Sequence, residues 1–225
     1  RVRGNDDPLG TWIHPVDARF FHDWHYGEPP LAWRPILGMG SLGYGLGVYM
    51  REAAYGLGLK RAVDLPVPVL CVGNLTTGGT GKTPVTLAAA SYLAQERTQR
   101  VVGLSRGYGA TEPQAYAPAT DPAFGDEAFL LQRELGRTTQ NAAVVVGRKR
   151  ADNACRALAE YRPDWIVLDD GFQYRPLART HDWVLLDARF LLGNGRLLPY
   201  GPLREPLSAL RRATAVLLTR CPEPG

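Results

Sequence analysis

A glycine-rich segment between an apolar run and a helical run constrains the fold of this chain more than any other feature. The apolar run PVLCVGN (68–74) predicts a strand, LTTGGTG follows it, and KTPVTLAAASYLA predicts a helix. The segment is close to the pattern G-x-x-x-x-G-K-[ST], a loop that binds phosphate with backbone N–H groups at a helix N-terminus. Thr76 stands where the pattern has its first glycine, but three later glycines supply the flexibility that the loop needs. We therefore predict a nucleotide-binding loop.

The loop pattern predicts a role for individual side chains. Lys82 is expected to reach the β- and γ-phosphates of a nucleoside triphosphate, and Thr83 to hold Mg²⁺ through its hydroxyl. Pro84 is tolerated in the first helical turn, where its missing N–H has no intrahelical partner. The predicted loop comprises Thr76, Thr77, Gly78, Gly79, Thr80, Gly81, Lys82 and Thr83.

Short apolar runs alternate with helical stretches around this loop. Strands are predicted at 68–74, 100–107, 142–147, 164–170, 182–188 and 213–220, and helices at 82–96, 124–136, 148–161 and 205–212. This alternation predicts an α/β fold of the P-loop NTPase type, with a mostly parallel sheet of buried strands flanked by helices. The ligand site is expected at the carboxyl ends of the strands.

Composition and charge exclude several classes of protein. Hydrophobic residues make up 45% of the 225 residues and charged residues 21%, which excludes wholesale disorder. The net charge of +4 suits an anionic partner such as nucleic acid, a nucleotide or an acidic lipid surface, although a solvated surface explains it equally well. Three scattered cysteines indicate a reducing compartment, and we assign no metal to His22 and His25.

The stretch from Trp33 to Leu59 is rich in apolar residues, glycine and tyrosine. Arg34, Arg51 and Glu52 interrupt it, so it lacks the roughly 18 uncharged apolar residues that a membrane-spanning helix needs. Two interpretations remain open at this point. The stretch is either an interfacial helix with aromatic and basic residues near lipid headgroups, or a helix that packs on the domain's own core.

Charged residues follow several of the predicted strands. DWIVLDDGFQY places Asp169 and Asp170 at a strand end, where carboxylates can hold Mg²⁺. Arg106 in SRGYG also ends a strand and can meet phosphate. Asp126 and Glu127 in GDEA begin a helix, where they serve either as caps or as a general base. Arg204 in GPLREP lies at a predicted helix start, where a cation opposes the helix dipole, so we expect it to bind phosphate.

Taken in order, VGNLTTGGTGKTP, SRGYG, GDEA, VGRKR, LDDGFQY and LPYGPLREP resemble the tetraacyldisaccharide 4'-kinase family, the lipid A 4'-kinases of Gram-negative bacteria. The resemblance covers about Trp33 to Arg220. It implies transfer of the ATP γ-phosphate, with Mg²⁺, to the 4'-hydroxyl of a tetraacylated glucosamine disaccharide 1-phosphate in lipid A biosynthesis. It implies a peripheral or monotopic protein at the cytoplasmic face of the bacterial inner membrane, with no nucleic-acid partner. Residues 1–60 would form an N-terminal segment with an interfacial helix, and 61–225 the P-loop kinase core.

The resemblance also implies roles for residues that match the family's motifs. Asp126 takes the place of the base that activates the sugar hydroxyl, and Lys82, Asp169 and Asp170 are the further catalytic residues. The expected metal ligands are Thr83, Asp169 and Glu205. The expected substrate or phosphate contacts are Arg106, Tyr108, Arg150, Gln173, Arg204 and Glu205. Two departures concern neighbours of these residues, because Tyr174 stands where the family has histidine and Ala128 where it has proline.

Two other functions are weighed against the kinase. An NTP-dependent switch or chaperone GTPase should carry an N/T-K-x-D segment, but TRCP (219–222) lacks its lysine and aspartate, and Thr77 stands where ParA-like switches carry lysine. A fragment that binds nucleotide without turnover is the third possibility. The chain starts at Arg1, and the smaller C-terminal lobe that the family carries is absent from the 225 residues.

Overall fold

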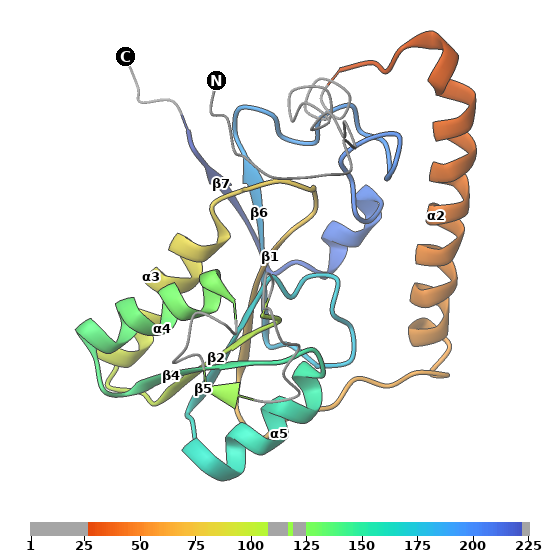
Figure 1. The fold of residues 1–225 in the computed structure, drawn as a ribbon. Helices are drawn as coiled ribbons and strands as arrows, with labels where there is room; N and C mark the ends of the chain where they lie inside the picture. Colours follow the sequence, from red (N-terminus) through yellow and green to blue (C-terminus); the bar gives the residue numbers. More distant parts are fainter. Residues whose placement is uncertain (1–26, 108–116, 119–124, 222–225) are drawn as a thin grey trace, which may run out of the picture.

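A seven-stranded sheet organises the part of the chain that the computed structural model describes, residues 27–107, 117–118 and 125–221 (Figure 1). The strand order is β3-β4-β2-β5-β1-β6-β7, and all neighbours are parallel except β3 and β4. The strands are β1 (Val69–Asn74), β2 (Val101–Ser105), β3 (Ala117–Pro118), β4 (Ala142–Val146), β5 (Trp165–Asp169), β6 (His181–Asp187) and β7 (Ala215–Thr219). Val72 of β1 lies beside Asp169 of β5, so the phosphate loop and the acidic strand end leave the sheet at the same edge.

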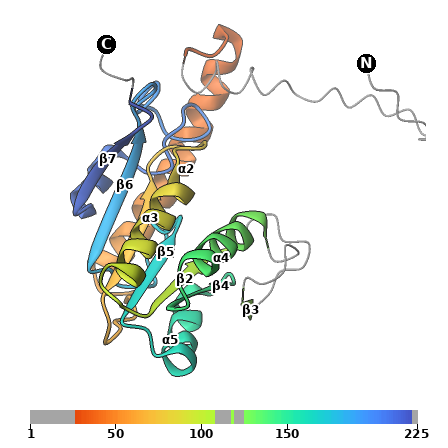
Figure 2. The ribbon, with the colours of Figure 1, turned by 90° about the vertical axis from the view of Figure 1, so that its left-hand side faces the viewer.

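Helices cover both faces of the sheet (Figure 2). The helical elements are η1 (Leu31–Trp33), α2 (Arg34–Gly56), α3 (Lys82–Gln95), α4 (Asp126–Thr138), α5 (Arg150–Tyr161) and η3 (Leu207–Arg212). Alternate residues of each strand point to opposite faces, so Leu70 packs in the cluster with α3 and α4, and Cys71 in the cluster with α5. A third cluster joins Phe172, Val184 and Leu203 to η3.

Helix α2 lies apart from the sheet, on the side of α5 and η3 (Figure 1). Its inner face contacts the segment between β6 and η3: the Ser41 hydroxyl donates to the Leu197 carbonyl at 3.0 Å, and the Tyr44 hydroxyl to the Arg204 carbonyl at 2.7 Å. Gly40 and Gly45 face Pro199 and Leu197, where a Cβ would come within 3.1 Å of those side chains. No helix in the described part of the chain is both long and apolar enough to cross a membrane.

The structure confirms all six predicted strands and three of the four predicted helices. The stretch at 205–212 differs from its prediction, because a 3₁₀ helix forms there and begins only after Pro206. The strand at 213–220 was predicted to be buried, but Val216 and Leu218 are 48% and 56% exposed. Among the described strands, β7 lies at the sheet edge and pairs with β6 alone. A periodicity argument cannot distinguish an edge strand from a central one.

Candidate functional site

The predicted phosphate loop connects β1 to α3. Gly78 and Gly81 have positive φ angles of 105° and 78°, which an L side chain adopts only with strain, and Gly81 is the N-cap of α3. The Thr219 hydroxyl at the end of β7 donates to the Thr80 carbonyl at 2.8 Å and holds the loop against the sheet. The backbone N–H groups at the α3 N-terminus therefore lie where phosphate binds in proteins of this topology.

The contacts and backbone conformation of Thr76 show why threonine can replace the first glycine of the pattern. It is 2% exposed and forms an antiparallel bridge with Leu203. Its φ angle is not positive, so no glycine is needed at this position. Nearby, the Arg204 N–H donates to the Leu75 carbonyl at 2.9 Å and the Thr77 N–H to the Pro202 carbonyl at 2.8 Å. This end of the loop is therefore held by the segment 201–205.

Two carboxylates at the end of β5 have opposite electrostatic surroundings. Asp169 is 4% exposed, and burial raises its pKa to about 6, although it accepts a hydrogen bond from the Thr86 hydroxyl at 2.9 Å. Asp170 adopts a positive φ of 46° and lies 3.7 Å from the Lys82 Nζ and 3.1 Å from an Arg204 guanidinium nitrogen. Burial opposes ionisation of Asp170, but Arg204 and Lys82 outweigh it and hold the pKa below its ordinary value.

Arg150 holds the turn that follows β5. It is 6% exposed and donates to the carbonyls of Asp169 and Asp170 at 2.8 and 3.1 Å. Its guanidinium lies 4.4 Å from the ring centroid of Tyr174, whose hydroxyl accepts the Ala151 N–H at 2.9 Å. The tyrosine at 174 thus packs beneath a buried arginine, a contact that accommodates this departure from the family pattern.

These residues surround a cavity of about 850 Å³. The lining includes most of the residues that the sequence singled out: Gly78, Gly79, Lys82, Arg106, Arg150, Asp169, Asp170, Gln173 and Arg204. Sequence reasoning weighed Glu127 as a general base and placed Tyr44 and Arg51 near lipid headgroups. It gave no site role to the other lining residues, Ser105, Arg148, Tyr174 and Leu198. The VGRKR motif contains Arg148, and its position after a strand is the signal that could have identified it.

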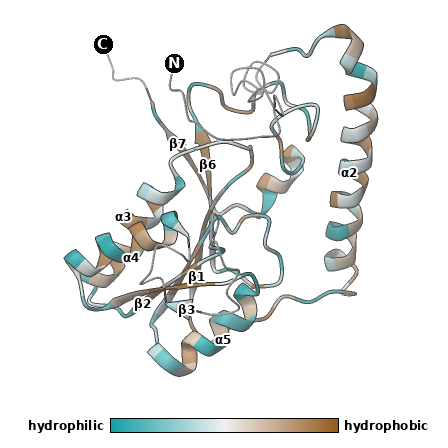
Figure 3. Ribbon diagram, viewed as in Figure 1, coloured by the Kyte–Doolittle hydropathy of each residue, from teal (hydrophilic) through white to brown (hydrophobic). Residues whose placement is uncertain are grey.

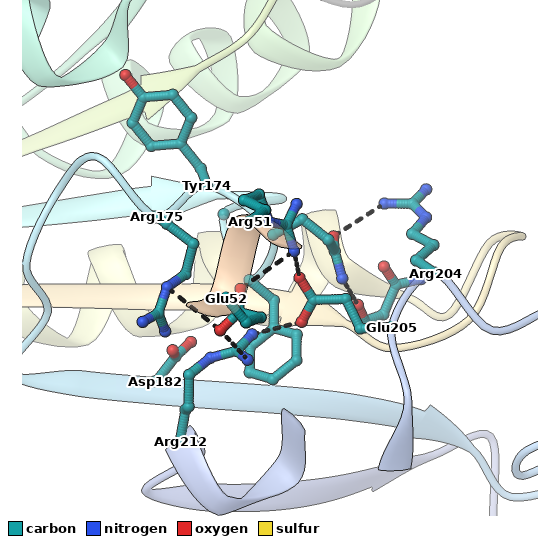
Figure 4. Close-up of polar contacts among 12 residues, drawn as sticks. Arg51, Glu52, Tyr174, Arg175, Asp182, Arg204, Glu205 and Arg212 are labelled. Atoms are coloured by element: carbon teal, nitrogen blue, oxygen red, sulfur yellow. Dashed lines mark hydrogen bonds and ion pairs between the residues drawn. The ribbon is translucent and has the colours of Figure 1, made fainter. Parts of the chain in front are cut away.

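The structure separates other predicted site residues from this cavity. Asp126 is exposed at the start of α4, and Glu127, the next residue, lines the wall instead. Glu205 is fully buried, and both of its carboxylate oxygens accept from arginines, Arg51 and Arg212, so this arrangement does not favour a metal-ligand role for it (Figure 4). Tyr108 lies outside the described residues. No group of three or more His, Cys, Asp or Glu side chains able to hold a metal occurs within the described segments.

A mostly parallel sheet with a phosphate loop after β1, and with a buried and a half-buried carboxylate at the end of its neighbour β5, defines a P-loop nucleotide-binding core. The family model described as tetraacyldisaccharide-1-P 4'-kinase (LpxK) matches residues 33–224. The chain is 46% identical over 196 residues to a tetraacyldisaccharide 4'-kinase from Anaeromyxobacter dehalogenans (strain 2CP-C), covering 84% of this chain and 50% of that protein. It is 40% identical over 193 residues to the Geobacter metallireducens protein of the same name, covering 83% and 56%.

A solved structure shows the same architecture. The crystal structure of "apo" form LpxK from Aquifex aeolicus in complex with ATP aligns with a TM-score of 0.71 and 34% identity, covering 84% of this chain and 58% of that one. The chain therefore belongs to the tetraacyldisaccharide 4'-kinase family. It spans about half the length of the curated relatives that it matches. Nothing in these comparisons favours the switch or GTPase alternative.

Proposed function

We propose that the protein transfers the γ-phosphate of ATP to the 4'-hydroxyl of a tetraacylated glucosamine disaccharide 1-phosphate. The observation that carries this proposal is a single cavity in which the phosphate-loop Lys82 and the carboxylates of Asp169 and Asp170 meet four further arginines besides Arg204. Such an excess of cations suits an acceptor that carries its own phosphate in addition to the nucleotide. The names of the relatives supply the identity of the acceptor.

Nucleotide binding requires a change of partners within the cavity. Lys82 and Arg204 both pair with Asp170 here, at 3.7 and 3.1 Å. Triphosphate oxygens at the α3 N-terminus would compete with Asp170 for these two cations, while the loop N–H groups and the helix dipole stabilise the negative charge. Lys82 and Arg204 would then neutralise the charge that develops on the transferred group.

The donor set at the end of β5 fits Mg²⁺. The Asp169 and Asp170 carboxylates are the hard oxygen ligands that this ion prefers. Thr83, the other proposed ligand, lies on α3 one turn before Thr86, whose hydroxyl is hydrogen-bonded to Asp169. When bound, Mg²⁺ would supply positive charge that stabilises the negative charge of the triphosphate during transfer.

The start of α4 provides two adjacent carboxylates for general base catalysis. Family resemblance assigns the proton from the sugar hydroxyl to Asp126, and the cavity wall contains Glu127. Both lie in the first turn of α4, which places the two carboxylates at the positive end of the helix dipole. We keep Asp126 as the proposed base and treat Glu127 as the residue against which it must be tested.

The outer surface of α2 supports docking on a membrane surface. Its exposed apolar side chains recur at helical spacing: Ile36, Met39, Leu42, Leu46, Tyr49 and Met50 are each 59–76% exposed. Figure 3 shows hydrophobic segments along this helix although it lies apart from the sheet. Acyl chains leave a bilayer only at about 0.8 kcal/mol per CH₂, so an enzyme acting on a tetraacylated sugar must come to the surface. We propose the cytoplasmic face of the inner membrane as that surface.

Product analysis tests the function directly. The full-length protein is incubated with ATP, Mg²⁺ and the disaccharide 1-phosphate in detergent micelles, and the lipids are analysed by mass spectrometry. The expected product carries one additional phosphoryl group on the distal sugar, and a Lys82→Ala preparation should form far less of it in the same time. Phosphate release from ATP without a phosphorylated lipid would contradict the proposal.

A further inference from the structure

A buried ion-pair cluster connects α2 to the segment that leads into η3. Glu205 is completely buried, and its two carboxylate oxygens accept from Arg51 of α2 and Arg212 of η3 (Figure 4). Arg212 also contacts Glu52 of α2 at 3.2 Å, and Arg175, in the loop after β5, lies 3.7 Å from the same glutamate. The cluster therefore joins three separate parts of the chain through two glutamates and three arginines.

The burial of Glu205 makes this cluster more than a surface ion pair. A carboxylate removed from water is tolerated only where cations and hydrogen bonds replace its hydration, and the loss of one partner leaves charge uncompensated. Exposed pairs contribute little by comparison, because water screens them. The position of Glu205 is thus tied to the position of α2 through Arg51.

Arg204, the residue before Glu205, is held at three points. Its carbonyl accepts the Tyr44 hydroxyl of α2 at 2.7 Å, and its N–H donates to the Leu75 carbonyl at the start of the phosphate loop at 2.9 Å. Its guanidinium donates to Asp170 at 3.1 and 3.2 Å and to Gln173 at 3.4 Å. One contact comes from α2 directly, and the cluster on Glu205 adds a second link to the same helix.

We propose that Arg51 and Tyr44 are positioning residues that hold Arg204 in place for phosphoryl transfer. The inference rests on the proposed function and deepens it. The inner face of α2 fixes the segment that presents Arg204 to Asp170, and its outer face carries the apolar residues proposed to meet the lipid surface. The helix proposed to meet the membrane therefore also sets the geometry of a cavity arginine. Glu205 acts in this scheme as the anchor of that segment.

Arg51 also lines the cavity, so a direct contact with substrate is the competing explanation. A double-mutant cycle separates the two, with Arg51→Met, Glu205→Gln and the double variant in the full-length protein, measured for kcat and KM. If Arg51 acts through Glu205, each single variant lowers kcat by about tenfold or more, and the double variant is no worse than the worse single one. Arg51→Lys should recover part of the loss, because it keeps a cation beside Glu205.

Arg34→Met is the matched control. It removes a cation from the same helix, but Arg34 contacts Glu28 and the Pro29 carbonyl and none of the cluster residues. Its kcat should stay near the wild-type value. If the effects of Arg51→Met and Glu205→Gln multiply, or if Arg51→Met raises only the KM for the lipid, the positioning role is wrong. A shift in Mg²⁺ dependence confined to Glu205→Gln would assign Glu205 to the metal instead.

Hydrogen exchange tests the inference without reference to catalysis. Peptides that contain the Arg204 amide should exchange faster in Arg51→Met and in Tyr44→Phe than in the wild type, while peptides from β2 remain unchanged. Tyr44→Phe removes one hydroxyl and leaves the cluster intact, so it serves if Arg51→Met does not fold. Unchanged exchange in Tyr44→Phe would overturn the inference. If the wild-type protein forms no phosphorylated lipid, the proposed function is wrong. The exchange measurement would still decide whether Arg51 and Tyr44 hold Arg204 in place.

Discussion

Replacement of Thr86 by valine removes one hydrogen bond from the buried carboxylate of Asp169. Both residues are buried, at 0% and 4% exposed, and the hydroxyl donates at 2.9 Å. Valine keeps the shape of threonine, so no cavity forms at this position of α3. A hydrogen bond to a charged group contributes about 1.5–3 kcal/mol, and we expect the free energy of unfolding to fall by this amount at pH 8.

The loss should depend on pH in a defined direction. Burial raises the pKa of Asp169 from an ordinary value of 3.8 to about 6. The stability associated with protonated Asp169 is therefore fully present below about pH 3.8 and is lost as pH rises through about 6. That interval corresponds to about 3 kcal/mol. The Thr86 hydrogen bond lowers this pKa, so its removal raises the pKa further and enlarges the loss at high pH.

Urea denaturation at pH 5 and pH 8 measures the effect, with a chelator present so that no divalent ion occupies the site. The control is Thr219→Val, because the Thr219 hydroxyl donates to the neutral carbonyl of Thr80 at 2.8 Å, and its loss should not depend on pH. Thr86→Val should be clearly more destabilised at pH 8 than at pH 5. An equal loss at both pH values, or a larger one at pH 5, would refute the link between this hydroxyl and an ionised Asp169.

Three other substitutions test the proposed site and surface. Lys82→Ala should lower turnover by about 10²–10³-fold in an ATP-coupled assay without changing the melting temperature, since its charge acts on phosphate; a near-normal rate would remove the phosphate loop from the mechanism. Asp126→Asn should lower kcat by about 10²–10⁴-fold with ATP affinity unchanged, and Glu127→Gln much less; the reverse order would make Glu127 the base. Leu42 and Leu46 are 76% and 59% exposed, so changing both to Asp should release the protein from anionic vesicles in a sedimentation assay while the fold persists; full co-sedimentation would place docking elsewhere.

The burial of α2 residues shows why the structure was needed to choose these positions. Val48 lies between exposed Leu46 and Tyr49 in sequence but is only 8% exposed. A helix with apolar residues on all sides does not reveal which face packs inward, because that depends on the partner surface. Contacts of Ser41 and Tyr44 with the segment 197–204 decide the inner face. The packing interpretation therefore holds for the inner face of α2. Contact of its outer face with lipid stays a prediction.

The sequence alone determined the class of fold and the place of the glycine-rich loop between β1 and α3. Three local features carried this prediction: strand periodicity, glycines at positions with positive φ, and Pro84 in the first turn of α3. Each affects the backbone only within a few residues of its own position. Asp169 and Asp170 followed from the same reasoning, because a charged pair after an apolar run lies at a strand end. Their predicted position at the carboxyl edge of the sheet is confirmed.

Only the tertiary structure decided how the remaining side chains are used. Glu205 and Arg51 are 154 residues apart in the chain, and no local pattern could show that they pair in a buried cluster. The choice between Asp126 and Glu127 at the cavity wall depends on how α4 is rotated against the sheet, and the exposure of β7 depends on its place at the edge. Burial and ion pairing depend on contacts between segments that are distant in the sequence. The packing of the whole domain determines these contacts, and neighbouring residues in the sequence do not.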